Sequence, residues 1–467
     1  MALRDRLPRH LFSQRGWGLL AAGAVCLLSA QIMGRRDLLS LSVLLIVLPL
    51  VSLAGIRLLK PRFQVYREFN PSPVETSAAT TVRLAVARTG SGGGRAIMEE
   101  RLPPRFGESP AFHFPSRSAK GGTSRYEYHL RSTKRGQYLI GPVTAEFTDP
   151  FGLSLHRRSI DDGDTLTVTP AAVELPATGL AGARGNDGIT ATRTRANPSD
   201  DDVMTREYRP GDPMRRVHWA ATAHHGALMV RQEESVTTPE ATVILDQRFA
   251  AFSAGHGSGL GGSASADGHE MITSGTFEWA VVAAISICTH LSERSYALRL
   301  LDPRGEPAFL RSPSAPEPEA EEFSGVSGLQ SIAESLAAIQ LSGPHHVARD
   351  HGGQDAGPAD FDDQLMDKLS AHRMRGPLIA VLGRISPSEA RALAPAAGYG
   401  ANAFAIIVSD RPADSEDSLE ALRRGGWRAV AVTTSISVPD AWTHFDHAGA
   451  APATAAADVR RGAGVGR

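Results

Sequence analysis

Two long stretches near the beginning of the chain contain no charged residue. Residues 16–33 form the first stretch, residues 38–56 form the second, and four residues separate them. A helix rises about 1.5 Å per residue, so each stretch covers roughly 27 Å, close to the thickness of a bilayer's hydrocarbon core. The pattern therefore predicts two transmembrane helices that form a hairpin in the lipid bilayer.

Basic residues near these stretches indicate the orientation of the hairpin. Arg4, Arg6, Arg9 and Arg15 precede the first stretch, and Lys60, Arg62 and Arg67 follow the second, whereas the turn holds only Arg35 and Arg36. Short loops rich in Lys and Arg stay in the cytoplasm. We therefore expect a multi-pass protein of the cytoplasmic membrane whose other domains face the cytoplasm. The alternative is a cleaved secretory signal, and the second long stretch argues against it.

Short runs that alternate between apolar and polar residues follow the hairpin. They lie at residues 81–87, 126–130 and 166–169, and turn-forming residues separate them. Alternation with a period of two is typical of strands with one buried face. After a hairpin domain over residues 1–60, we predict an antiparallel β-sandwich-like domain over residues 61–175.

The pattern changes again at residue 240, where continuous apolar runs alternate with stretches of helical period. Continuous apolar strands separated by helices indicate a parallel sheet that is covered on both faces. We therefore predict a doubly wound α/β domain over residues 240–447. Its strands are expected at residues 241–245, 296–301, 378–382, 404–408 and 429–432. Its helices are expected at residues 277–291, 329–339, 387–396 and 415–423.

Segments rich in Gly, Ser, Pro and His interrupt this α/β pattern. They cover residues 253–268, 312–328 and 343–359. Such compositions do not supply enough apolar surface for a core, so we predict disordered insertions. Residues 176–239 are predicted to be a linker that carries a polar block, and residues 448–467 a disordered tail.

The composition and the common catalytic motifs point to no particular chemistry. The net charge is −1, so no overall field attracts nucleic acid. The two cysteines, Cys26 and Cys288, fall in different predicted helices, which leaves neither a disulfide framework nor a cysteine metal site. The chain contains no P-loop, no G-x-S-x-G motif and no S-x-x-K motif. We therefore predict no catalytic residue and no cofactor.

Asp246 follows the first strand of the predicted α/β domain, at the edge where open α/β sheets bind ligands. A strand that ends in Asp resembles von Willebrand factor A-type domains, whose metal site continues Asp-x-Ser-x-Ser. Here the run is Asp246-Gln247-Arg248-Phe249-Ala250, so both hydroxyl ligands are missing. Arg248 would also place a positive charge where the ion binds. We therefore expect a degenerate metal position at Asp246 and no bound metal.

Two weaker patterns are interpreted as surface loops. Residues 257–262 satisfy G-x-G-x-x-G, but they do not follow a strand directly, as dinucleotide binding requires. Histidines occur as the adjacent pairs His224-His225 and His345-His346, without the i, i+4 spacing that suits metal chelation.

The densest group of polar and aromatic residues covers residues 205–223. Residues 201–234 hold five Arg and six Asp or Glu, so the segment is nearly neutral and nucleic-acid binding is not predicted. Arginine–carboxylate pairs around Tyr208 and Trp219 are the expected arrangement, since Arg binds carboxylates in a defined geometry.

This block resembles the signature of the bacterial domain-of-unknown-function 58 family. The matching positions are Arg206, Glu207, Tyr208, Gly211, Asp212, Arg215, Trp219 and Ala223, followed by Leu228-Met229-Val230. Residues 134–138 and 149–153 are similar to two further elements of that family. The resemblance implies a membrane-anchored protein with a degenerate von Willebrand A-like domain. It also implies partners, since such proteins are often encoded beside a MoxR-type AAA ATPase and a transglutaminase-like membrane protein.

The leading hypothesis is a non-enzymatic interaction or assembly protein that docks a MoxR-type AAA ATPase or another envelope-biogenesis partner. In this hypothesis the signature residues either join the β-sandwich-like domain to the α/β domain or form the docking surface. The alternative is an enzyme, a hydrolase with an unfamiliar site around Asp246, His218 and Asp212.

Overall fold

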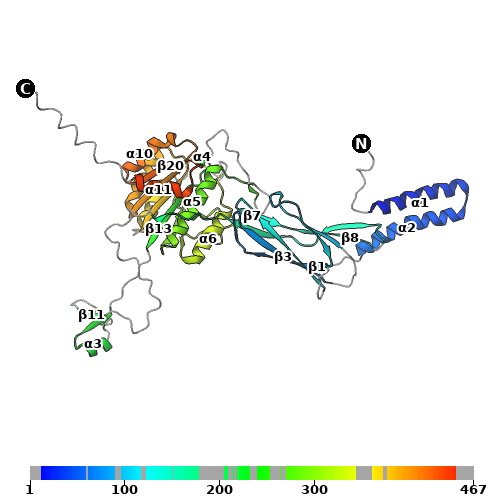
Figure 1. Cartoon of the computed structure of the whole chain (residues 1–467), viewed down its shortest axis with the longest axis horizontal. Coiled ribbons are helices and arrows are strands. Elements are labelled where there is room, and N and C mark those ends of the chain that lie inside the picture. The colour runs from blue at the N-terminus through cyan, green and yellow to red at the C-terminus, as the bar shows by residue number, and fades with distance from the viewer. Residues whose placement is uncertain are drawn as a thin grey trace, which may run out of the picture.

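The computed structural model consists of a helical hairpin, a β domain, a small unit around residues 205–231, and an α/β domain. Figure 1 shows the hairpin and the α/β domain at opposite ends of the molecule, with the β domain between them. The structure describes residues 12–58, 62–89, 96–116, 122–149, 151–177, 205–208, 214, 217, 219–231, 239–252, 263–264, 270–342, 360–371 and 376–448.

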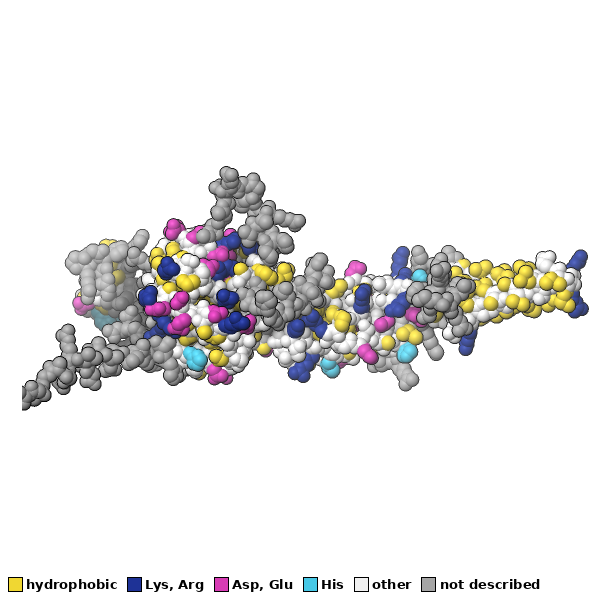
Figure 2. All heavy atoms as spheres, turned by 90° about the horizontal axis from the view of Figure 1, so that it is seen from above, with side chains coloured by type: hydrophobic (Ala, Val, Ile, Leu, Met, Phe, Trp, Pro, Cys, Tyr) yellow, Lys and Arg dark blue, Asp and Glu magenta, His cyan; other side chains and the backbone are white. Residues whose placement is uncertain are grey.

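The hairpin consists of α1 (Gln14–Met33) and α2 (Arg36–Leu58). Ser13 caps the start of α1 by accepting a hydrogen bond from the Gly16 N–H, and Gly34 ends the helix with a φ of 65°. Both helices are long and apolar enough to cross a membrane, as residues 16–33 and 38–56 predict. Figure 2 shows hydrophobic side chains over most of this rod, with Lys or Arg at its tip.

The β domain contains three sheets, and the strands predicted at residues 81–87, 126–130 and 166–169 are confirmed within β3, β6 and β10. The sheets have the orders β1-β3-β6, β2-β10-β7 and β5-β4-β8-β9, and their neighbours are antiparallel except β2 with β10. The strands are β1 (Arg62–Asn70), β2 (Val74–Glu75), β3 (Ala79–Thr89), β4 (Ala96–Glu100), β5 (Ala111–Phe114), β6 (Thr123–Arg131), β7 (Gly136–Ile140), β8 (Val143–Thr148), β9 (Leu155–Ser159) and β10 (Asp164–Thr169). A 3-10 turn, η2 (Pro104–Phe106), lies between β4 and β5.

Alternation along β3 produces the core of the β domain. Val82, Leu84 and Val86 point to the same face of the sheet and are fully buried. Leu84 and Val86 pack against a cluster that includes Met98, whereas Val82 packs against one that includes Tyr138. One sheet therefore covers the other two, which is a two-layer packing of mainly antiparallel strands.

The α/β domain is built on a sheet with the order β17-β16-β13-β18-β19-β20. All neighbours are parallel except β17, which is antiparallel to β16, so the predicted parallel sheet is confirmed. The strands are β13 (Glu240–Leu245), β16 (Ala297–Leu301), β17 (Glu322–Phe323), β18 (Pro377–Leu382), β19 (Asn402–Val408) and β20 (Arg428–Val432).

Helices cover both faces of this sheet, because its strands are apolar on both sides. Val243 faces the core shared with α5, α6 and α11, whereas Ile244 faces the core shared with α8, α9 and α10. The helices are α4 (Phe249–Phe252), α5 (Gly275–Ser292), α6 (Gly325–Ala337), α8 (Asp363–Ala371), α9 (Pro387–Leu393), η5 (Ala394–Tyr399), η6 (Pro412–Ser415), α10 (Glu416–Arg424) and α11 (Val438–Ala448). The four predicted helices are found as α5, α6, α9 with η5, and α10, whereas α4, α8 and α11 were not predicted. The von Willebrand A-like identity of the domain stays a prediction.

The prediction that residues 312–328 form an insertion that packs no core is wrong. The Ser312 and Ser314 hydroxyls are buried and donate to the Ser335 carbonyl at 2.6 and 3.2 Å, and Phe323 of β17 joins the core. The polar side chains are satisfied at the end of α6, so the segment packs despite its composition. In the other two predicted insertions, the structure describes only β14 (Ser263–Ala264), which pairs with β15 (Glu270–Met271). The predicted tail lies outside the described residues, except Ala448.

Candidate functional site

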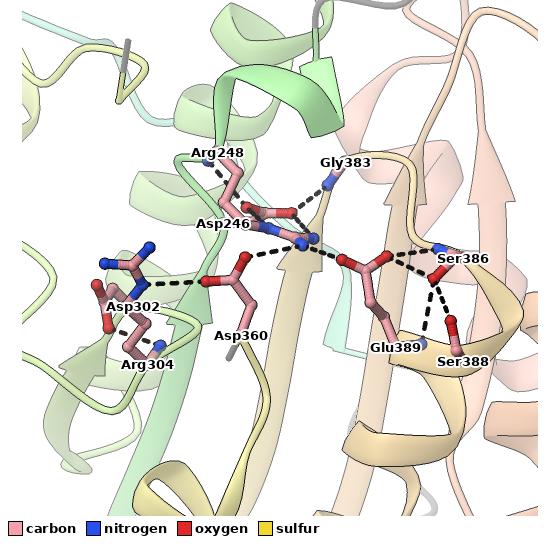
Figure 3. A network of polar contacts seen from close by, with 9 residues as sticks. All are labelled: Asp246, Arg248, Asp302, Arg304, Asp360, Gly383, Ser386, Ser388 and Glu389. Atoms are coloured by element: carbon pink, nitrogen blue, oxygen red, sulfur yellow. Dashed lines mark hydrogen bonds and ion pairs between the residues drawn. The ribbon is translucent and has the colours of Figure 1, made fainter. Parts of the chain in front are cut away.

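The carboxyl edge of the parallel sheet is the first candidate site. Asp246 lies directly after β13, and its side chain is fully buried. The Asp246 N–H donates to the Val381 carbonyl at 2.9 Å, and the Gly383 N–H donates to the Asp246 carboxylate at 3.3 Å (Figure 3). Backbone groups after two neighbouring strands therefore place this carboxylate between β13 and β18.

Arg248 forms an ion pair with the carboxylate of Asp246. Its Nε donates to Oδ1 and its Nη2 to Oδ2, both at 2.9 Å, which is a bidentate ion pair. The same guanidinium contacts Asp360 at 3.4 Å and donates to Glu389 of α9 (Figure 3). It also lies over the ring of Phe361, 4.8 Å from the centroid. The Arg248 guanidinium thus forms ion pairs with three carboxylates.

The charges in this cluster stabilise one another. Burial disfavours the charged form of Arg248, but the carboxylates of Asp246 and Glu389 outweigh it and raise the pKa of the guanidinium. Burial also opposes ionisation of Glu389, yet hydrogen bonds from Ser386 and the charge of Arg248 lower the pKa of that carboxyl. The guanidinium of Arg248 therefore lies beside the Asp246 carboxylate, where a metal ion would bind. Within the described ranges, no three His, Cys, Asp or Glu side chains are grouped to hold a metal ion.

A further acidic residue at the same edge is Asp302, which follows β16. Its Oδ1 accepts hydrogen bonds from the backbone N–H groups of Arg304 and Glu306, both at 2.9 Å. Burial raises the pKa of Asp302 to about 6. Arg304 donates in turn to Asp360 at 3.1 Å (Figure 3). Asp302 thus orders a turn, and ion pairs fill this part of the edge. Asp212 and His218, the other residues of the hydrolase alternative, lie outside the described residues.

The second candidate site is the junction between the β domain and the α/β domain, which sequence reasoning did not single out. Arg135 precedes β7, and its side chain is only 2% exposed. It donates to both carboxylate oxygens of Glu278 on α5, at 2.9 and 2.8 Å. It also donates to the carbonyls of Leu336 at 2.6 Å and Ile339 at 2.8 Å, where α6 ends. The signal in the sequence was the similarity of residues 134–138 to a family element.

The interdomain ion pair lies beside a cleft. The cleft has a volume of about 560 Å³ and is lined by Lys134 and Arg135 from the β domain and by Ser274, Glu278 and Trp279 from the start of α5. Burial opposes the charge of Glu278, but Arg135 outweighs it and lowers the pKa of that carboxyl. The charged groups at this junction are therefore used to hold two domains together.

The signature block forms a small unit of its own within the predicted linker. It contains β11 (Thr205–Glu207), α3 (Trp219–His225) and β12 (Met229–Arg231), and β11 pairs antiparallel with β12. The Tyr208 N–H donates to the Leu228 carbonyl at 2.7 Å. Figure 1 shows this unit apart from the six-stranded sheet.

Large apolar side chains of the small unit reach the surface. Trp219 is 65% exposed, Met214 55% and Leu228 38%. The Trp219 side chain therefore does not join the β domain to the α/β domain. Among the other signature residues, Glu207 and Arg206 lie on β11, whereas Gly211, Asp212 and Arg215 lie outside the described residues.

The predicted surface loops are placed only in part. His224 and His225 are exposed, as expected, but they lie in the last turn of helix α3 and not in a loop. Residues 257–262 and His345-His346 lie outside the described residues.

Comparisons with known proteins identify no family. No family model matches the chain, and no curated protein matches it. Among solved structures, the chain is similar to a superoxide reductase (neelaredoxin) from Ignicoccus hospitalis. The identity is 13%, the match covers 24% of this chain and 86% of that chain, and the TM-score is 0.15. A similarity at this level supports no conclusion about fold or function.

Proposed function

We propose that the chain is a membrane-anchored, non-enzymatic protein-binding module. The hairpin holds it in the cytoplasmic membrane as a multi-pass protein, and the β domain carries the α/β domain and the small unit away from the bilayer. The Lys and Arg residues on the side of the chain ends support a cytoplasmic location for these domains.

The ion pair between Asp246 and Arg248 is the observation that favours a binding role over a catalytic one. A hydrolase at this edge needs an acidic group or a metal that can reach substrate. Here both oxygens of Asp246 accept hydrogen bonds from Arg248, and Glu389 holds the same guanidinium. The edge is therefore better suited to stabilising the sheet than to turning over a ligand.

The small unit is the proposed docking surface. Its described part exposes Met214, Trp219 and Leu228, and Trp is enriched among residues that dominate binding energy at protein interfaces. The resemblance of this unit to the domain-of-unknown-function 58 signature suggests the partner, a MoxR-type AAA ATPase. A transglutaminase-like membrane protein is the second partner that the resemblance suggests.

A binding measurement with the full-length protein tests this proposal. The wild type and a Trp219→Ala variant, both in detergent, are titrated with a purified MoxR-type ATPase. Removal of a central Trp costs about 2 kcal/mol or more, so we expect affinity to fall by roughly 30-fold. A Val326→Ala variant is the control, because Val326 is 85% exposed on α6, outside the small unit. Unchanged affinity of Trp219→Ala would reject the docking surface, and no binding by the wild type would reject the partner.

A further inference from the structure

A loop of the β domain packs against the base of the hairpin. The described part of this hairpin-contact loop consists of residues 149 and 151–154, between β8 and β9. The Ser13 N–H donates to the Leu153 carbonyl at 2.9 Å, and the Ser13 hydroxyl donates to the Gly152 carbonyl at 2.6 Å. On α2, the hydroxyl of Ser52 lies 3.0 Å from that of Ser154. The loop therefore contacts both helices.

These contacts lie at the level where the apolar spans end. Gly16 and Ser52 both fall inside the stretches that are long and apolar enough to cross a membrane. A Cβ atom at Gly16 would lie 2.1 Å from the Leu153 carbonyl oxygen, so only glycine allows this close approach. If the hairpin spans a bilayer, the loop reaches the boundary between headgroups and acyl chains.

The loop is held in shape by its own hydrogen bonds. Asp149 is 6% exposed and accepts hydrogen bonds from the N–H groups of Phe151 at 3.1 Å, Leu153 at 2.6 Å and Ser154 at 2.8 Å. Burial opposes the charge of Asp149, but hydrogen bonds from Ser52 and these amides lower the pKa of its carboxyl. Gly152 adopts a φ of 67°, which completes the turn. The backbone is thus organised before any ligand binds.

Among the described residues of this loop, Phe151 is the large side chain that lies at the surface. It is 66% exposed, whereas Leu153 is 5% exposed and Ser154 is fully buried. Trp17 lies in the first turns of α1, with its ring 5.4 Å from that of Phe12. Aromatic side chains at this level are typical of the membrane interface, where an apolar ring meets polar headgroups.

Basic side chains lie close in the chain to the two ends of the hairpin. Arg15 in the first turn of α1 and Arg62 at the start of β1 are both exposed. Each Lys or Arg near an anionic bilayer surface contributes about 1 kcal/mol of attraction. The exposed surface around the base of the hairpin therefore combines an aromatic ring with positive charge.

We propose that Phe151 enters the headgroup region of an anionic bilayer beside the hairpin, with Arg15 and Arg62 binding acidic headgroups. The hairpin-contact loop then fixes the angle of the β domain to the membrane. This inference rests on the membrane anchoring in the proposed function. The occupant is the bilayer because the loop contacts Gly16 and Ser52, which lie inside the two apolar stretches.

Depth-dependent fluorescence quenching tests the proposal. The full-length protein is reconstituted into vesicles of phosphatidylcholine and phosphatidylglycerol, with bromine on the upper part of the acyl chains. In a Phe151→Trp variant, we expect the added fluorescence to lose most of its intensity. The control is Tyr66→Trp, because Tyr66 is equally exposed at 65% but lies about 13 Å further along β1 than Arg62. The fluorescence added at this position should not be quenched.

The signal of Trp17, isolated by subtracting a Trp17→Phe variant, separates the two possible failures. Quenching of Trp17 without quenching at Phe151 would reject the lipid contact while leaving membrane anchoring intact. No quenching of either would reject both. Replacement of Arg15 and Arg62 by Gln should weaken quenching at Phe151 in the anionic vesicles but not in pure phosphatidylcholine. Equal quenching in both lipids for the Phe151→Trp protein that keeps Arg15 and Arg62 would contradict the role of the acidic headgroups.

Discussion

The interdomain ion pair allows a quantitative prediction, because Arg135 is almost fully buried and uses most of its donors. An Arg135→Ala variant removes both hydrogen bonds to Glu278 and leaves the carbonyls of Leu336 and Ile339 without this donor. Removal of one partner from a buried ion pair costs about 3–5 kcal/mol. The Glu278 side chain is still 39% exposed, and water stabilises it in the variant, so we expect a loss of about 2–3 kcal/mol.

Native-state hydrogen exchange of the full-length protein in detergent measures this loss at the junction itself. Peptides from the start of α5 and the end of α6 report the free energy of local opening. A loss of about 2–3 kcal/mol corresponds to exchange that is roughly 30- to 160-fold faster. Peptides from β19, an internal strand of the sheet, should exchange at the wild-type rate unless the whole domain opens.

A double-mutant cycle separates the ion pair from the other effects of truncation. Arg135→Ala, Glu278→Ala and the double variant should give a coupling energy above about 1 kcal/mol, because the two side chains are in direct contact. The matched control is Arg424→Ala on α10, which breaks an exposed i, i+4 pair with Glu420 that is worth about 0.3–0.5 kcal/mol. If Arg135→Ala accelerates exchange no more than Arg424→Ala does, the reasoning about this junction is wrong.

Three further predictions concern other parts of the molecule. Gly16→Ala should speed hydrogen exchange in the hairpin-contact loop by displacing α1, whereas Gly18→Ala should not, because nothing lies within 4 Å of a Cβ at Gly18; equal rates would contradict this packing. Arg248→Met should cost about 3–5 kcal/mol in unfolding free energy by leaving Asp246 buried and unpaired, and adding Asp246→Asn should recover part of it. Burial, with a smaller contribution from a neighbouring arginine, lowers the pKa of His290 to about 4. The unfolded chain takes up this proton near pH 6.5, so stability should be full above pH 6.5 and fall towards pH 4. His290→Phe should reduce that fall in thermal unfolding scans, and an unchanged pH profile would exclude His290 as its cause.

The period of the apolar residues was enough to predict most of the helices and strands. Residues 16–33 and 38–56 carry no charge around the whole helix, β3 alternates because only one face is buried, and β13 is mainly apolar on both sides because helices cover both faces. These patterns depend on the local environment of each element, so they can be recognised without knowing its neighbours.

Composition was a poor guide where polar side chains find partners inside the fold. Residues 312–328 lack a hydrophobic period, yet Ser312 and Ser314 pack because the end of α6 offers the carbonyl of Ser335. A local reading of the sequence does not show that acceptor, since it lies 23 residues from Ser312.

The same distinction applies to Asp246 and to the residues around it. The position of Asp246 after a buried strand, and the positive charge two residues later, could be read directly along the chain. Only the tertiary structure brought in Asp360 and Glu389, which lie 112 and 141 residues from Arg248. Electrostatic attraction depends on distance in space, so the partners of a buried charge are decided by the packing of β13, β18 and α9 and not by their order in the chain.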